Sequence, residues 1–202
     1  MEVKREAVLA RQRPEINSKL KDVTVAILGA GGLGSNVAMM LARLGIGRLI
    51  LYDYDVVEAS NLNRQNYGVR DIGKKKVERT KAHLQEMLPY VEVEARDRYV
   101  DGGELERLYD EADIVIEAFD GVESKVLAYD YFCEREKPYI CTTGVAGIHG
   151  KLRRKDLNNI YVVGDFHGEN RNDCYMPKVM AIAAMECRVV LELIDQEEDI
   201  HG

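Results

Sequence analysis

Four closely spaced glycines could bind a phosphate group. Gly29, Gly31, Gly32 and Gly34 follow a short apolar run and precede an amphipathic stretch. Because glycine has no Cβ, backbone N–H groups there can approach an anion closely, and a helix beginning at this point adds partial positive charge. A G-x-G-x-x-G pattern between a strand and a helix predicts that the loop holds the phosphates of a nucleotide.

A carboxylate lies where a nucleotide's sugar would be. Asp53 ends the second apolar run, 24 positions after Gly29, and at this place in an α/β protein a carboxylate can accept hydrogen bonds from ribose hydroxyls. Tyr52 and Tyr54 flank it, and we expect both to pack rather than to bind a ligand. These residues suit a nicotinamide dehydrogenase as well as a nucleotidyltransferase.

The segment that follows separates these two classes. Residues 53–65 read D-Y-D-V-V-E-A-S-N-L-N-R-Q and closely resemble the D-x-D-x-V-x-x-S-N-L-x-R-Q signature of the ubiquitin-activating-enzyme-like superfamily, which includes ThiF and MoeB. Residues 73–76 resemble its G-x-x-K, and Asp120 resembles its strand-end aspartate. The similarity covers roughly residues 19–194. Together with the short chain, residues 60–65 look most like the compact ThiF proteins of thiamine biosynthesis.

The resemblance implies an ATP site and a magnesium ion. Arg64 and Lys76 would neutralise phosphates, with Lys75 as the alternative lysine, and Asp120 would hold the magnesium ion. The family usually has Asn after this aspartate, where this chain has Gly121. Zinc is not expected, because the family's four zinc-binding cysteines are missing. The implied nucleotide-binding residues are Gly29, Gly31, Gly32, Gly34, Asp53, Asp55, Asn61, Arg64, Gln65 and Lys76.

The implied reaction is adenylyl transfer to a carboxylate. In this family the C-terminal Gly-Gly carboxylate of a ubiquitin-like sulfur-carrier protein, such as ThiS, attacks the α-phosphate of ATP. Fixed cations must offset the repulsion between the two anions. No general base is needed, because a carboxylate is already ionised at neutral pH.

Two further residues are implied by the family. ThiF and MoeB relatives form homodimers in which an N-terminal arginine reaches the partner's ATP site; Arg11 is the candidate and Arg13 the alternative. Relatives can also carry a late cysteine that captures the activated carrier, with a cysteine desulfurase as sulfur donor. Cys174 is the candidate, because it lies in a polar loop before the last helix, near Arg171 and Lys178.

The other cysteines and the rival functions complete the expectations. Cys133, Cys141 and Cys187 fall in apolar segments, where a thiol is expected to be inert. Within the superfamily, the rivals are activation of a molybdopterin-type carrier and a dehydratase that adenylates tRNA. Two rivals do not involve adenylyl transfer. One is an NAD-dependent oxidoreductase, in which Arg64 and Lys76 would have no role. The other is a non-catalytic partner subunit, which would tend to lack Arg64 or Lys76.

The elements that position these residues alternate between strands and helices. Short apolar runs predict strands at Val23–Leu28, Arg48–Tyr52, Val91–Ala95, Ile114–Ala118 and Tyr139–Thr142. Crossover helices are expected at Leu33–Leu44, Lys75–Met87 and Val122–Glu134, and a final helix at Pro177–Ile194. Gly150–Arg154 and Ile160–Gly164 are too close for a helical crossover and should pair antiparallel. The fold class is therefore α/β: a Rossmann-like, doubly wound mixed sheet, mainly parallel, with antiparallel strands late in the chain.

Composition limits the partners and the compartment. The 202 residues are expected to form a single adenylyltransferase domain, with an N-terminal helical arm (1–20) and an acidic tail (195–202). A net charge of −7 disfavours a nucleic-acid partner. Residues 23–42 carry no charge, but the four glycines interrupt them, so no membrane span is expected. Four cysteines without a C-x-x-C pair and a charged N-terminus fit the cytoplasm.

Overall fold

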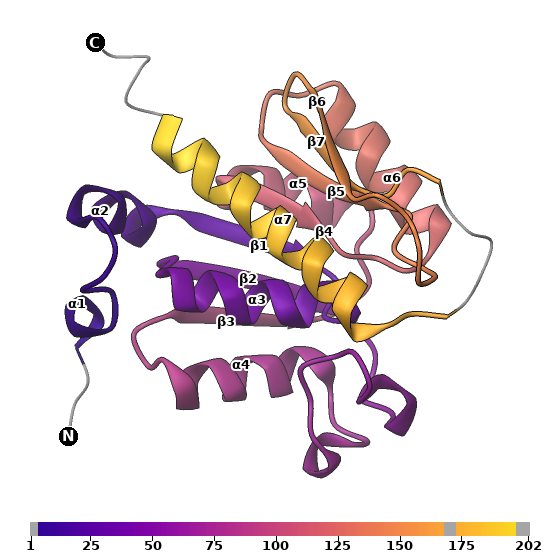
Figure 1. Cartoon of the computed structure of the whole chain (residues 1–202), viewed down its shortest axis with the longest axis horizontal. Helices are drawn as coiled ribbons and strands as arrows, with labels where there is room; N and C mark the ends of the chain where they lie inside the picture. The colour runs from indigo at the N-terminus through magenta and orange to yellow at the C-terminus, as the bar shows by residue number, and fades with distance from the viewer. Residues whose placement is uncertain (1–3, 168–172, 197–202) are drawn as a thin grey trace.

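A seven-stranded sheet forms the centre of the molecule, in the order β3-β2-β1-β4-β5-β7-β6 (Figure 1). The computed structural model describes residues 4–167 and 173–196. Neighbouring strands from β3 to β7 pair in parallel, and β6 pairs antiparallel with β7. The predicted fold class, a mainly parallel Rossmann-like sheet with late antiparallel pairing, is confirmed.

The expected elements are present within two residues of their predicted bounds, except for the first strand of the hairpin. The strands are β1 (Thr24–Leu28), β2 (Arg48–Asp53), β3 (Glu92–Asp97), β4 (Ile114–Glu117), β5 (Tyr139–Thr143), β6 (Arg153–Leu157) and β7 (Ile160–Gly164). The helices are α1 (Arg5–Val8), α2 (Pro14–Asp22), α3 (Gly32–Leu44), α4 (Lys76–Met87), α5 (Gly102–Glu111), α6 (Val122–Cys133) and α7 (Met176–Gln196), with 3-10 turns η1 (Ala59–Asn61) and η2 (Val69–Asp71).

Both faces of the sheet are covered by helices. Helices α3, α4 and α7 pack on one face, and α5 and α6 pack on the other (Figure 1). Strand β1 is therefore buried on both faces. Val25 and Ile27 belong to the apolar cluster under α3, α4 and α7, while Ala26 and Leu28 belong to the cluster under α5 and α6. A strand buried on both faces is a continuous apolar run, which is why the sequence signal was clear.

The first strand of the hairpin is displaced from its predicted position, whereas the second has the predicted bounds. The first strand begins at Arg153 rather than at Gly150. Gly150 has a φ of +120°, and a Cβ there would lie 2.6 Å from an oxygen of Asp165. The Lys178 ammonium group donates to Asp165 and to the carbonyls of Ala146 and His149. Residues 144–150 are therefore a fixed turn.

The start of α2 lies near the end of α7, because Arg13 pairs with Asp195 at 2.6 Å. The Arg5 guanidinium donates to the carbonyl of Gly45 at 2.6 Å, so the N-terminal arm is tied to the end of α3. Of the predicted acidic tail, Asp195 and Gln196 belong to α7 and the remainder lies outside the described residues. No described helix is long and apolar enough to cross a membrane.

Candidate functional site

A cavity of about 700 Å³ lies at the carboxyl ends of the parallel strands. Its wall comes from residues that follow β1 to β5 and from the first turns of α3, α6 and α7. Open α/β sheets bind their ligands at this edge. Of the predicted site residues, the wall includes Gly29, Gly31, Gly32, Asp53, Asp55, Arg64, Gln65, Lys76, Asp120 and Cys174.

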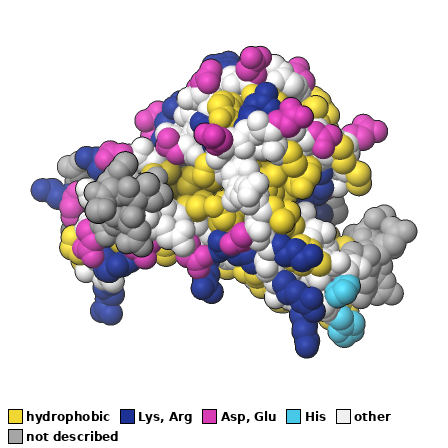
Figure 2. Space-filling model, turned by 90° about the horizontal axis from the view of Figure 1, so that it is seen from above, with side chains coloured by type: hydrophobic (Ala, Val, Ile, Leu, Met, Phe, Trp, Pro, Cys, Tyr) yellow, Lys and Arg dark blue, Asp and Glu magenta, His cyan; other side chains and the backbone are white. Residues whose placement is uncertain are grey.

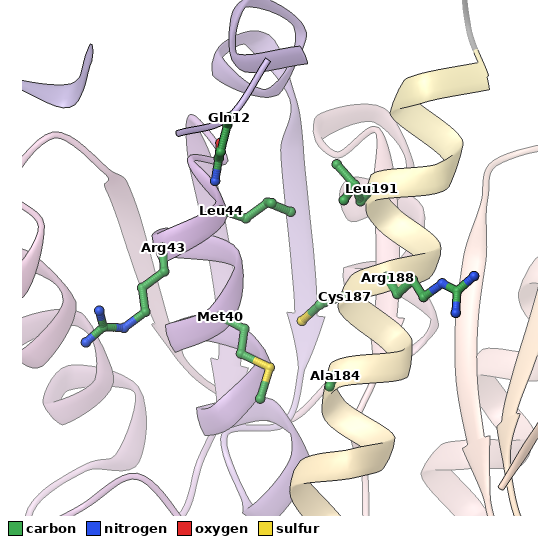
Figure 3. Close-up of a pocket in the computed structure, with 8 residues that line it drawn as sticks. All are labelled: Gln12, Met40, Arg43, Leu44, Ala184, Cys187, Arg188 and Leu191. Carbon is green, nitrogen blue, oxygen red and sulfur yellow. The ribbon is translucent and has the colours of Figure 1, made fainter. Parts of the chain in front are cut away.

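A second cavity, of about 370 Å³, lies between α3 and α7 (Figure 3). Met40, Leu44 and Leu191 make its wall mostly apolar, while Arg43 and Arg188 point away from it on opposite sides (Figure 3). The polar groups suited to chemistry are therefore gathered in the larger cavity.

The glycine loop is shaped by close backbone packing. Gly29 has a φ of +111°, and a Cβ there would lie 2.7 Å from the carbonyl oxygen of Ala118. A Cβ on Gly34 would lie 1.8 Å from the carbonyl oxygen of Gly29. Gly34 therefore lets α3 approach β1, while Gly31 and Gly32 present the start of α3 to the cavity. That helix start favours an anion.

Asp53 is oriented by the backbone. One carboxylate oxygen accepts the Ala30 N–H at 2.7 Å, and the other accepts the Asp55 N–H at 2.8 Å. Burial raises the pKa of Asp53, while the positive charge of Lys76 and the two backbone hydrogen bonds act in the opposite direction. Each oxygen can still accept a hydroxyl hydrogen bond.

Lys76 is a buried cation at the start of α4. Its side chain is 8% exposed, and its ammonium group lies 2.7 Å from Asp55, whose side chain is 48% exposed. The Tyr67 hydroxyl lies 2.7 Å from the Ala30 carbonyl and 3.3 Å from that of Lys76, so it joins the glycine loop to α4. Lys75, the alternative lysine, instead pairs with Asp97 at 3.0 Å.

Arg64 lies over the start of α3. A Cβ on Gly32 would be 3.6 Å from the Arg64 Cγ, so the side chain covers this glycine. One Arg64 nitrogen donates to the Ser60 carbonyl at 3.0 Å. Gln65 lies beside Gly31, is 7% exposed, and its side-chain oxygen has no hydrogen-bond partner among the described residues. A buried amide with an unused oxygen beside a cavity suggests a missing ligand.

Two nucleotide-site residues predicted from sequence lie outside the cavity wall. Asn61 accepts the Glu58 N–H at 2.9 Å and so holds η1, which precedes Arg64. Gly34 contacts the backbone of the loop, as described above. Tyr52 and Tyr54 both line the cavity, but Tyr52 is fully buried whereas Tyr54 is 55% exposed.

The half of the cavity near β4 and β5 contains the predicted Asp120 and a lysine that the motifs did not reveal. Asp120 is exposed on its wall. Lys125 also lines it, 2.8 Å from Glu117 and 3.4 Å from the Thr142 hydroxyl. Burial raises the pKa of Glu117, and the Lys125 charge opposes that shift. Lys125 could have been suspected only from its place in the first turn of α6, the helix that follows β4.

A second carboxyl group is buried near this pair. Glu186, in α7, is fully buried, and neither of its oxygens has a hydrogen-bond partner among the described residues. Burial, and then the negative charge of Glu117, raise the pKa of Glu186 well above its ordinary value of 4.5. Burial without a hydrogen-bond partner therefore favours the neutral form of this carboxyl group, since a lone buried carboxylate is costly.

Glu186→Gln is expected to stabilise the fold increasingly as the pH rises. A carboxyl whose pKa is raised by folding contributes stability below its unfolded pKa and loses it as the pH rises toward the folded value. Glutamine stays neutral, so the difference between the melting temperature of Glu186→Gln and that of wild type should increase from about pH 5 to about pH 8. Glu192→Gln, on the same helix, is the control. Salt bridges and hydrogen bonds with Arg154 and Arg188 lower the pKa of Glu192. Glu192 is therefore ionised in both the folded and the unfolded state above about pH 5, and the difference between Glu192→Gln and wild type should stay constant up to about pH 8. A pH-independent difference for Glu186→Gln would refute a neutral Glu186.

The thiols differ in their access to the cavity. Cys174 is half-buried and lines the wall, while Cys141 and Cys187 are buried. Burial raises the pKa of Cys141 to about 12. Cys133 is exposed as the last residue of α6, so it lacks the apolar surroundings expected from its segment. Arg171, expected beside Cys174, lies outside the described residues.

The N-terminal arginines lie away from the cavity of their own chain. Arg11 is exposed between α1 and α2 and is not part of the wall. Arg13 pairs with Asp195 at 2.6 Å. Any role for Arg11 in a reaction would therefore have to be exerted on another subunit.

Comparison with known proteins identifies similar chains. The model described as "ThiF family" matches residues 3–199. The tRNA threonylcarbamoyladenosine dehydratase of Bacillus subtilis is 37% identical over 129 residues, covering 63% of this chain and 51% of that protein. Adenylyltransferase and sulfurtransferase MOCS3 of Aedes aegypti is 33% identical over 155 residues, covering 76% of this chain and 35% of that protein. The chain thus spans about a third to a half of the length of these relatives.

A solved structure shares the whole fold. The crystal structure of the E. coli tRNA N6-threonylcarbamoyladenosine dehydratase, TcdA, in complex with ATP has a TM-score of 0.88. It covers 100% of both chains at 18% sequence identity. At this identity the likeness concerns the architecture alone.

Proposed function

The chain belongs to the ThiF family, and on that premise we propose that it is an ATP-dependent adenylyltransferase that activates a terminal carboxylate. The acceptor we propose is the C-terminal Gly-Gly carboxylate of a small ubiquitin-like sulfur carrier, as in thiamine biosynthesis. The main support for the proposal is that Arg64, Lys76, Asp53 and the glycine loop lie together on one cavity wall. Acceptor-dependent exchange of pyrophosphate into ATP is its test.

The charges on the wall suit this reaction. The phosphates would lie at the glycine loop, where Arg64 and Lys76 offset their charge and the charge that grows on the leaving pyrophosphate. Lys76 is held by Asp55, so its position is fixed before the nucleotide binds. The acceptor carboxylate would enter from the half near β4 and β5, and it needs no base to remove a proton.

Asp120 fits a magnesium ion. In nucleotide sites this ion is usually held by one or two carboxylates and by phosphate oxygens. Within residues 4–167 and 173–196, no cluster of three or more His, Cys, Asp or Glu side chains could hold a metal alone. Asp120 would therefore share the ion with the nucleotide. When bound there, the ion would add positive charge beside the phosphates.

A second candidate acceptor is tRNA. The relative from Bacillus subtilis is named as a threonylcarbamoyladenosine dehydratase, and a threonylcarbamoyl group also ends in a carboxylate. Against this acceptor stands the net charge of −7. On the face in Figure 2, acidic and basic side chains are interspersed over most of the surface instead of forming one broad basic area. We therefore favour a protein acceptor.

We also propose that the enzyme is a homodimer in which Arg11 acts on the partner's site. Arg11→Ala and Arg64→Ala should each be inactive alone. A mixture re-equilibrated at equal amounts should regain about a quarter of the wild-type activity, because half of the dimers then contain one complete site. Arg13→Ala is the control, since Arg13 already pairs with Asp195. Absence of recovery on mixing would remove a role for Arg11 in trans.

We propose that Cys174 captures the activated carrier as a covalent adduct. Its thiolate would attack the carrier's acyl-adenylate, so that a sulfur–carbon bond forms and AMP leaves; a cysteine desulfurase would supply the sulfur. Mass spectrometry after incubation with carrier and MgATP should show a thioester adduct that Cys174→Ser abolishes. Cys133→Ser, which removes an exposed thiol outside the cavity wall, should leave the adduct unchanged. An adduct of equal yield in Cys174→Ser would exclude this thiol.

A further inference from the structure

Two exposed tyrosines border the cavity, and the reaction described above gives them no role. Tyr54 follows β2 and is 55% exposed, and Tyr99 follows β3 and is 50% exposed. Both line the cavity. Their ring centroids are 5.8 Å apart, and the ring planes are tilted by 55°. Large aromatic faces left open beside a cavity provide a surface on which a flat ligand can stack.

The sheet order locates the nucleobase relative to these rings. The phosphates are proposed at the end of β1 and the ribose on Asp53 at the end of β2. Because β2 lies between β1 and β3, a nucleotide extended in this direction brings its base to the residues after β3. The residues there that line the cavity are Arg98, Tyr99 and Val100.

Tyr99 is held in place for such a contact. Its hydroxyl lies 3.2 Å from the Ser124 hydroxyl on α6, and the next residue, Val100, is 4% exposed. Tyr54 packs against the Tyr99 ring from the β2 side, and its own carbonyl accepts the Lys75 ammonium at 2.8 Å. Since the two rings meet at a tilt, Tyr54 can brace Tyr99 without covering it completely.

We propose that Tyr99, braced by Tyr54, stacks on the base of the bound nucleotide and makes the cavity selective for purines. A purine offers a larger π surface than a pyrimidine, so stacking favours ATP over CTP. This inference rests on the proposed function, because the positions of the phosphates and the ribose come from it. It adds the residue that distinguishes the base.

Calorimetric titration of the full chain tests the contact with three probes: MgATP, MgCTP and inorganic tripolyphosphate, which has no base. Tyr99→Ala should weaken ATP binding roughly tenfold or more. It should reduce the preference for ATP over CTP and leave tripolyphosphate binding unchanged. Tyr99→Phe keeps the ring and should stay close to wild type. Tyr129→Ala is the matched control, because Tyr129 is 36% exposed on α6 and lies outside the cavity wall.

The possible failures can be told apart. If Tyr99→Ala binds ATP as tightly as wild type, the stacking contact does not exist, although ATP binding itself stands. If it weakens ATP and tripolyphosphate equally, Tyr99 only maintains the shape of the cavity, and the inference is again wrong. If the wild-type chain binds neither ATP nor tripolyphosphate, the proposed function fails and the inference fails with it.

Discussion

Arg64→Ala is expected to lower the rate of acceptor-dependent pyrophosphate exchange by about 10²–10³, the usual cost of losing one preorganised contact to a developing charge. The guanidinium lies over the start of α3, where the phosphates are proposed to bind. Its hydrogen bonds are to the Ser60 carbonyl and the Asn63 side chain, close to it in sequence. Folding should therefore change little, and the thermal melting curve should stay near that of wild type.

Arg70→Ala is the control for this substitution. Arg70 is an exposed arginine on η2 of the same connection between β2 and α4, and it is not part of the cavity wall. Its removal should leave the exchange rate at the wild-type level. Wild-type exchange by Arg64→Ala would show that Arg64 does not contact the phosphates.

Lys76→Met is expected to reduce the same rate by a similar factor of about 10²–10³. Methionine can fill the apolar part of the buried site, so the main loss is the positive charge. Asp55 then loses its partner, but it is about half exposed and can be hydrated, so the stability cost should stay within about 1 kcal/mol.

Lys75→Met is a closely matched control, because it removes the adjacent positive charge. Lys75 pairs with Asp97 and donates to the Tyr54 carbonyl, and it is not part of the cavity wall. Exchange by Lys75→Met should remain within a few-fold of wild type. A larger loss of exchange in Lys75→Met than in Lys76→Met would show that Lys75, and not Lys76, contacts the phosphates.

The half of the cavity near β1 and β2 could be predicted from the sequence because it is built from local patterns. The glycine loop needs positive φ at Gly29 and a close approach at Gly34, and both needs restrict the residue type. Asp53 and Lys76 lie at the end of a strand and the start of a helix, and these boundaries are visible in the hydrophobic pattern.

Lys125 and the pairing of Tyr54 with Tyr99 could not be predicted, because they depend on tertiary contacts. Lys125 is fixed by Glu117 and Thr142, which come from two different strands. Tyr54 resembles a packing residue in sequence, and only the neighbouring end of β3, with Tyr99, gives it a partner.

One helix was missed and one strand was displaced, for different reasons. Helix α5 begins with Gly102 and Gly103, which usually weaken a helix, but the Asp101 side chain caps it by accepting the Glu104 N–H at 2.9 Å. Strand β6 starts late because Gly150 packs against Asp165.

The most direct measurement of the proposed function is the exchange of labelled pyrophosphate into ATP with a candidate carrier protein ending in Gly-Gly. The proposal predicts exchange that requires MgATP and the free C-terminal carboxylate, and that stops when this carboxylate is converted to an amide. Exchange supported by tRNA carrying threonylcarbamoyladenosine, and not by the carrier, would identify the acceptor as tRNA. Exchange that is absent with both acceptors, or that persists with the amidated carrier, would contradict adenylation of a carboxylate.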